Sequence, residues 1–282
     1  MIGIFDSGYG GLTILKKIRE QLPGYDYLYL GDNARAPYGT RSFECIYRYT
    51  LEAVRYMIDQ GCTLIILACN TASAKALRTI QQHDLPGMNA ERSAVNGGRK
   101  VNVLGVIRPT VEVVPSLTQT KHIGVLATPG TVASESYIIE LEKQDASLTV
   151  TQQACPVWVP LIEAGEHTSE GAQFFISKYV QQLISRDPFI DTVLLGCTHY
   201  PLIQPMIDRE LAKHCNHPCQ TIAQGNIVAL SLKDYLLRHP EMETNLQKGG
   251  ECHYLTTDDA LRFGDAATLF LGERVRAEHV EY

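Results

Sequence analysis

Two cysteines, Cys69 and Cys197, stand in the same kind of sequence and carry a side chain suited to proton transfer. Each follows a run of consecutive apolar residues, LIIL at 64–67 and VLL at 193–195, and hydrogen-bonding side chains come directly after each. A run without alternation indicates a strand buried on both faces. Ligands bind at the carboxyl ends of strands in open α/β sheets. We therefore predict that both thiols lie in one functional site and face each other across one substrate.

A pair of thiols suits the inversion of a carbon atom that carries one acidic hydrogen. Inversion needs a base on one face of the carbon and an acid on the other, and the reverse reaction exchanges the two roles. Because the ordinary cysteine pKa is about 8.5, one thiolate and one thiol can coexist near neutrality. Asp6 is a candidate to adjust the protonation of Cys69, and His199 that of Cys197. Helix-start N–H groups and four side chains are predicted to hold the substrate's charged groups: Ser7, Asn70, Thr71 and Thr198.

The elements that must position these residues alternate between strands and helices. Strands are predicted at 2–5, 25–30, 64–67, 102–107, 122–127, 147–152, 193–196, near 221 and at 252–256. Helices are predicted at 12–22, 42–60, 72–82, 111–117, 132–143, 171–185, 202–213, 227–237 and 260–271. This order indicates parallel sheets covered by helices. The segment 86–100 is polar, contains glycine and lacks a helical period, so it is predicted to be an exposed loop.

The two halves of the sequence resemble each other. Residues 2–8, IGIFDSG, have the pattern of residues 123–129, IGVLATP, and a cysteine-ending strand follows each of them. We expect an α/β protein with two similar, pseudo-symmetric domains, each a parallel sheet flanked by helices. If the carboxyl ends of the two sheets face each other, the two thiols converge on a cleft between the domains.

The amino-acid composition limits the kinds of molecule that this protein is expected to bind. The chain has 282 residues, a net charge of −6 and a pI near 5.8, which argues against nucleic acid as the main partner. No apolar run approaches the ~20 residues of a membrane span, and the amino terminus enters a strand directly. We expect a cytoplasmic protein with no membrane partner, whose eight cysteines are free thiols.

Six segments carry a resemblance to a known family. FDSGYGGL, GDNARAPYGTRS, ACNTASA, CPVWVPLIEAG and GCTHYPLI resemble, in this order, the signature segments of glutamate racemases, members of the cofactor-independent aspartate/glutamate racemase superfamily. LTTDDALRFGDAATLFLG resembles the family's closing segment. The resemblance implies interconversion of L- and D-glutamate without pyridoxal phosphate or metal, supplying D-glutamate for peptidoglycan. It also implies a homodimer.

The resemblance also implies residue roles and domain limits. Cys69 would deprotonate D-glutamate and Cys197 would deprotonate L-glutamate, with Asp6, Glu163 and His199 as supporting acid–base residues. The substrate-contacting positions would be Asp6, Ser7, Tyr38, Gly39, Asn70, Thr71, Thr198 and His199. The first domain would comprise 1–100 with 214–282, and the second 101–213.

Two segments depart from the family pattern. The segment Gly87 to Lys100 looks like an insertion, which we expect on the surface with an effect on oligomer contacts. The tetrapeptide at 223–226, AQGN, replaces an acidic turn that contains serine.

Other features of the sequence invite alternative interpretations. The glycine turn after Ile4 lacks a full dinucleotide fingerprint, and Asp6 would repel a pyrophosphate. The segment 214–219, HCNHPC, crowds potential zinc ligands but has no Cys-x₂-Cys pair. Cys45, Cys62 and Cys155 are interpreted as packing residues. Two alternative functions stay open: another racemase of the superfamily, specific for aspartate or hydantoin, and a non-catalytic binding module.

Overall fold

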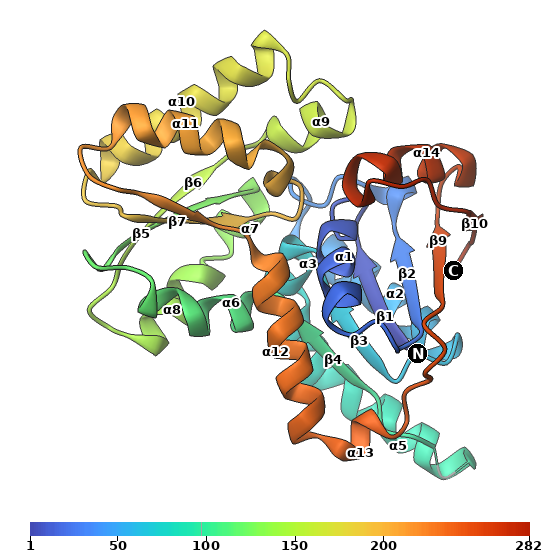
Figure 1. Ribbon diagram of the computed structural model, residues 1–282. Coiled ribbons are helices and arrows are strands. Elements are labelled where there is room, and N and C mark those ends of the chain that lie inside the picture. The colour runs from blue at the N-terminus through green and yellow to red at the C-terminus, as the bar shows by residue number, and fades with distance from the viewer. Residues whose placement is uncertain (97) are drawn as a thin grey trace.

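Two parallel sheets, each flanked by helices, form the computed structural model, which describes residues 1–96 and 98–282 (Figure 1). The larger sheet has the strand order β10-β9-β2-β1-β3-β4, and the smaller has β6-β5-β7-β8. The strands that pair in them run parallel. The predicted α/β class with two sheets is confirmed.

The larger sheet contains strands from both ends of the chain. Its strands are β1 (Ile2–Asp6), β2 (Tyr27–Gly31), β3 (Leu64–Leu67), β4 (Asn102–Gly105), β9 (Cys252–Thr256) and β10 (Ala277–His279). The helices between β1 and β4 are α1 (Leu12–Gln21), η1 (Asn33–Arg35), α2 (Phe43–Asp59), α3 (Asn70–Lys75), α4 (Leu77–Thr79), the π-helical η2 (Ile80–Asp84) and α5 (Leu85–Asn96). After β8 come α12 (Gln224–Arg238), α13 (Pro240–Glu243) and α14 (Ala260–Leu271).

The smaller sheet comes from the middle of the chain. Its strands are β5 (His122–Ala127), β6 (Thr149–Ala154), β7 (Thr192–Gly196) and β8 (Gln220–Ile222). The helices between β4 and β8 are α6 (Ile107–Val113), η3 (Val114–Ser116), α7 (Pro129–Ala133), α8 (Ser136–Gln144), α9 (Trp158–Glu163), α10 (Glu170–Arg186), η4 (Tyr200–Ile203) and α11 (Gln204–His214).

The strands that end in the two cysteines are buried along their whole length. All residues of β1, β3 and β7 are buried, which confirms the interpretation of the non-alternating apolar runs. The internal repeat has a packing reason. A Cβ at Gly3 would lie 2.6 Å from Met57 Cε, and one at Gly124 would lie 2.8 Å from Leu183 Cδ2. In each half, a glycine lets a helix pack closely on the first strand of the repeat.

The two sheets differ from the predicted domain ranges at both boundaries. β4 lies in the larger sheet, beside β3, although its residues fall within the predicted second domain, 101–213. β8 lies in the smaller sheet, beside β7, although its residues fall within the segment 214–282 assigned to the first domain. We therefore propose domain boundaries near residues 106 and 223, where the chain crosses between the sheets.

The prediction of a loop at 86–100 is wrong for most of its length, because α5 continues to Asn96. The π-helical turn η2 precedes Pro86, and such a wide turn accommodates a residue without an N–H. The Asn89 amide accepts from Val101 N–H at 2.8 Å and donates to the Val101 carbonyl at 3.0 Å. This tertiary contact holds the helix next to the start of β4. Gly97, in the predicted insertion, lies outside the described residues.

Other differences are smaller. The predicted helix 132–143 is two helices, because Glu135 has a left-handed backbone with φ 54° between α7 and α8. β10 was not predicted. The start of α2 is confirmed: Ser42 Oγ accepts the N–H of Cys45 as an N-cap. Within the described ranges, no helix has the length and apolar character needed to cross a membrane.

Candidate active site

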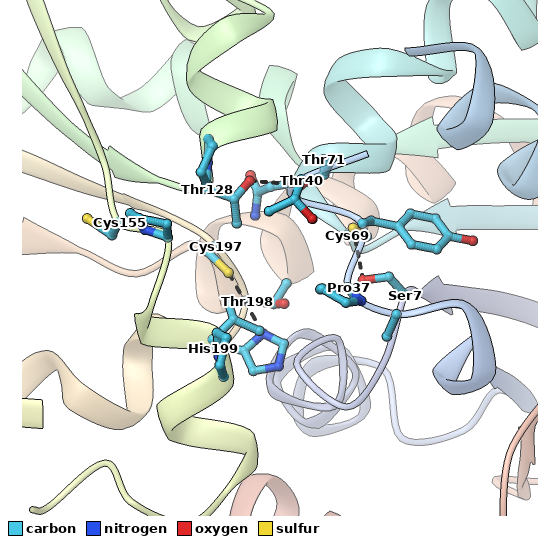
Figure 2. A pocket seen from close by; sticks show the side chains of 18 of the residues that line it. Ser7, Pro37, Thr40, Cys69, Thr71, Thr128, Cys155, Cys197, Thr198 and His199 are labelled. Carbon is cyan, nitrogen blue, oxygen red and sulfur yellow. Dashed lines mark hydrogen bonds between the residues drawn. The ribbon is translucent and has the colours of Figure 1, made fainter. Parts of the chain in front are cut away.

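Cys69 and Cys197 line a single cavity of about 90 Å³. They come from the carboxyl ends of β3 and β7, one in each sheet, and Figure 2 shows the two sulfur atoms on opposite sides of the cavity. A buried water occupies about 10–15 Å³ on this scale, so the space suits a small organic molecule. The predicted convergence of the two thiols on one cleft is confirmed.

Cys69 is almost fully buried at the start of α3. Its sulfur accepts the N–H of Ala72 at 3.5 Å, and its thiol donates to Ser7 Oγ at 3.5 Å. Burial and the nearby Asp6 carboxyl raise the pKa of Cys69 to about 12, against the opposing effect of these two hydrogen bonds. The Cys69 side chain is therefore a thiol near neutral pH.

Asp6 lies at the end of β1, behind the cavity wall rather than among the residues that line it. Its Oδ2 accepts the N–H of Gly8 at 3.0 Å, and its Oδ1 is buried with no hydrogen-bond partner in the described structure. Burial raises the pKa of this carboxyl, although the neighbouring His199 works in the opposite direction. Asp6 is thus a buried carboxyl that holds its proton more firmly than an exposed aspartate does.

Cys197 has a cationic neighbour instead. Its Sγ lies 3.8 Å from His199 Nδ1, and His199 Nε2 lies 2.9 Å from Glu163 Oε1. Burial disfavours the charged imidazole, but the contacts with Cys197 and Glu163 outweigh it and raise the pKa of His199 to about 10. A charged His199 donates one N–H to each of these neighbours, so a positive charge lies next to the Cys197 sulfur.

The two domains touch closely at Gly10, two residues before α1 begins at Leu12. A Cβ at this position would lie 2.2 Å from Thr198 Oγ1 and 2.4 Å from His199 Nδ1. Thr13 Oγ1 also donates to the Thr198 carbonyl at 2.9 Å. Because only a glycine leaves room for the His199 ring, this contact fixes the second-domain side of the cavity against the first domain.

Similarity to known proteins bears on what this cavity does. A model of the Asp/Glu/Hydantoin racemase family matches residues 2–224. A glutamate racemase of Ruegeria sp. (strain TM1040) is 40% identical over 287 residues, which cover 98% of this chain and 98% of that protein. The chain belongs to the Asp/Glu/Hydantoin racemase family.

Solved structures of this family agree. A glutamate racemase isoform from Bacillus anthracis superposes with a TM-score of 0.82 at 29% identity, covering 100% of this chain and 97% of that chain. A glutamate racemase from Francisella tularensis subsp. tularensis SCHU S4, in complex with D-glutamate, gives a TM-score of 0.81 at 31% identity, covering 99% and 97%. The sequence-based recognition of an amino-acid racemase is confirmed.

The remaining racemase-type positions surround the same cavity. Ser7, Tyr38, Gly39, Asn70, Thr71, Glu163, Thr198 and His199 all line it. The hydroxyl of Tyr38 is bonded to Asp32 Oδ2, so its polar group is already engaged. Their predicted contacts with a substrate stay predictions.

Sequence reasoning missed Thr128, which also lines the cavity. Its hydroxyl lies 3.0 Å from Thr71 Oγ1 (Figure 2). It also caps α7 by accepting the N–H of Thr131. The internal repeat held the signal, because Thr128 occupies the position in the second half that Ser7 occupies in the first.

The remaining cysteines lie outside the pair that faces across the cavity, and they bear on the zinc alternative. Cys155 borders the cavity but is 1% exposed, and its thiol is directed at the Gln153 carbonyl at 3.6 Å. All eight cysteines are free thiols. Across residues 1–96 and 98–282, no group of three or more His, Cys, Asp or Glu side chains is arranged to hold a metal ion.

Proposed function

We propose that this chain is a glutamate racemase that interconverts L- and D-glutamate through two bases, Cys69 and Cys197. One observation carries the proposal: two thiols from separate sheets line one cavity on opposite sides. A substrate Cα held between them would have one sulfur on each face. That is the arrangement that inversion of a carbon centre requires.

The proton transfers follow from this placement. With L-glutamate bound, the Cys197 thiolate takes the Cα proton, and the electron pair of the broken C–H bond stays on the substrate as a carbanion. The Cys69 thiol then gives its proton to the opposite face, forming D-glutamate and a Cys69 thiolate. The reverse reaction starts from the Cys69 thiolate and the Cys197 thiol. One proton is gained and one lost by the substrate in each direction.

The neighbours of each sulfur support these roles. A protonated His199 stabilises negative charge on Cys197, and Glu163 stabilises the charge on His199. On the other side, burial keeps Cys69 protonated, so it is ready to act as the acid. Asp6 is the group near Cys69 that can accept or return a proton when Cys69 acts as the base.

Glutamate is the substrate favoured by the comparisons. Full-length similarity is to glutamate racemases, and one related structure holds D-glutamate. The hydroxyls of Ser7, Thr71, Thr128 and Thr198 provide hydrogen-bond donors for two carboxylates. We infer a role in supplying D-glutamate for peptidoglycan in the cytoplasm, and a homodimeric assembly, which light scattering of the purified protein would test.

The decisive experiment is chiral analysis of L-glutamate incubated with purified protein and no added cofactor. We expect D-glutamate to accumulate until the enantiomers are equal in amount, and L-aspartate to react far more slowly. Faster reaction with aspartate would instead indicate an aspartate racemase. Binding of glutamate without any D-glutamate formation would favour a non-catalytic binding module and contradict the proposal.

A further inference from the structure

Three buried side chains form a closed ring of hydrogen bonds next to Cys69. The Tyr137 hydroxyl donates to Asn70 Oδ1 at 2.5 Å, and Asn70 Nδ2 donates to Gln224 Oε1 at 2.7 Å. Gln224 Nε2 closes the ring by donating to the Tyr137 hydroxyl at 2.8 Å. The three residues are at most 2% exposed. Each of the three bonds joins one donor to one acceptor, and the three run in the same direction around the ring.

The backbone sets that direction through Gln224. One of its two N–H groups goes to Tyr137, and the other is shared between the Val106 carbonyl at 3.3 Å and Thr110 Oγ1 at 3.0 Å. Thr110 already uses its hydroxyl proton on the same Val106 carbonyl, at 2.8 Å, so both groups can only accept from Gln224. If the Gln224 amide were turned over, its oxygen would face these two acceptors. Its Oε1 must therefore face Asn70.

This orientation determines what Asn70 presents to the cavity that it lines. With Oδ1 bound to Tyr137 and one N–H of Nδ2 bound to Gln224, the second N–H of Nδ2 is left for a molecule in the cavity. A substrate carboxylate can only accept hydrogen bonds, so it matches an N–H and not an amide oxygen. Asn70 in the opposite orientation would repel it.

The ring also joins separate parts of the fold. Asn70 begins α3, Tyr137 lies on α8 and Gln224 begins α12, where the chain returns from the smaller sheet to the larger one. Figure 1 shows α12 beside α3 and α6 where the domains meet. Gln224 thus contacts elements of both domains and also binds Asn70, the residue next to Cys69.

We propose that Gln224 is a positioning residue for the racemase reaction: together with Tyr137 it orients the Asn70 amide so that an N–H faces the substrate carboxylate. Gln224 belongs to the tetrapeptide AQGN, which departs from the family pattern seen in the sequence. The inference rests on the proposed function, because it requires a carboxylate substrate between Cys69 and Cys197.

The test is steady-state kinetics of Gln224→Met, a variant of similar length that cannot form the ring. The contact is made in the ground state and in the transition state, so KM for glutamate should rise about tenfold while kcat stays within about threefold. Thr110→Val is the matched control. It removes a buried hydrogen bond to the same amide but leaves the Val106 carbonyl to orient it, so KM should stay within about twofold.

A double-mutant test with Asn70 distinguishes a positioning role of Gln224 from general destabilisation of the protein. In an Asn70→Ala background, Gln224→Met should cause no further rise in KM, since the group that it orients is gone. Should Gln224→Met fail to fold, Tyr137→Phe removes only the hydroxyl and is expected to show the same non-additivity. An unchanged KM, an equal effect of Thr110→Val, or additive effects with Asn70→Ala would overturn the inference. Loss of racemisation in the unmodified protein would instead contradict the proposed function.

Discussion

The first-domain and second-domain sides of the cavity hold the same reactive group in different surroundings. Cys69 is buried next to the Asp6 carboxyl, and both effects favour its neutral form, although the hydrogen bond with Ser7 works in the opposite direction. Cys197 has the His199–Glu163 pair beside it, which places a positive charge next to its sulfur. Two residues that exchange roles in the proposed reaction therefore lie in different electrostatic surroundings. In the proposed mechanism, Cys197 would take the proton from L-glutamate and Cys69 would supply one to the opposite face.

Replacing either reactive cysteine by serine should have the largest effect on activity, because it removes one side of this pair. We expect Cys69→Ser and Cys197→Ser each to lower kcat/KM by about 10²- to 10⁴-fold, because each removes one acid–base group. L- and D-glutamate have equal free energies, so kcat/KM must fall equally in both directions. Chiral analysis of product from each enantiomer measures this.

Proton exchange in D₂O then shows which sulfur serves which enantiomer. Cys69→Ser should still exchange the α-proton of L-glutamate, and Cys197→Ser that of D-glutamate, as followed by NMR. Cys45→Ser, a partly exposed thiol on α2, is the control and should racemise normally. Near-normal turnover in either site variant would remove the two-base mechanism.

His199→Gln should have the next largest effect, lowering kcat/KM by about 10²-fold because the cation beside Cys197 is lost.

His199→Gln should also alter the pH dependence of stability. Folding raises the pKa of His199 from 6.5 to about 10, so the extra bound proton stabilises the fold fully below pH 6.5. This contribution is lost as the pH rises toward 10.

Denaturant unfolding between pH 6.5 and 10 checks that effect. The decrease in unfolding free energy over this range should be smaller in His199→Gln than in the unmodified protein. His122→Gln is the control. It disrupts the pair of His122 Nδ1 with Asp187 Oδ2, which has the same length, 2.9 Å, and lies at the amino-terminal end of β5. This variant should leave kcat/KM unchanged. An identical pH dependence in the His199 variant would contradict the assigned charge.

Asp6→Asn should lower kcat/KM between about tenfold and a hundredfold, yet stabilise the fold near neutral pH. A carboxyl whose pKa is raised by burial ionises less easily in the folded state, so ionisation costs stability as the pH rises above 3.8. The amide removes that cost, which thermal unfolding at pH 7 would detect.

Asp191→Asn is the matched control with the opposite sign. Although burial works against its charge, hydrogen bonds from Thr118, Gln119 and Thr120 lower the pKa of Asp191, so its charge stabilises the fold at neutral pH. Its amide variant should unfold at a lower temperature and keep its activity. A lower melting temperature for Asp6→Asn would argue against an uncompensated buried carboxyl.

Glu163→Gln should have the smallest effect, a decrease in kcat/KM of about tenfold or less. Its side chain is 26% exposed, so solvent screens the charge that it offers His199. The basic limb of the pH–rate profile should move to lower pH, since His199 loses a carboxylate that helps it to hold its proton. Glu166→Gln, three residues further on, should leave the profile where it is.

Much of this architecture could be predicted because the two reactive cysteines follow strands with a strong hydrophobic pattern. The runs before Cys69 and Cys197 are buried on both faces, and their short length and β-branched residues favour a strand over a buried helix. β5, β9 and α14 also have the predicted bounds. Local pattern and tertiary packing agree in these segments.

The sequence-based predictions were wrong or incomplete where contacts between residues far apart in the sequence determine the structure. α5 contains a proline and a glycine that argue against a helix, and it depends on a π-helical turn and on the contact of Asn89 with Val101. The hydroxyl cluster of Thr71, Thr128 and Thr131 exists only when the two domains meet. No short window of sequence contains these relationships.

The missing side chain at Gly10 has a kinetic consequence. The volume that a Cβ would occupy there is filled by the ring of His199 and the hydroxyl of Thr198. Any hinge motion wide enough to admit an amino acid at this seam must withdraw both groups together. If racemisation proceeds as proposed, the substrate would enter in an opened conformation, and the closed one would keep bulk solvent away from the carbanion.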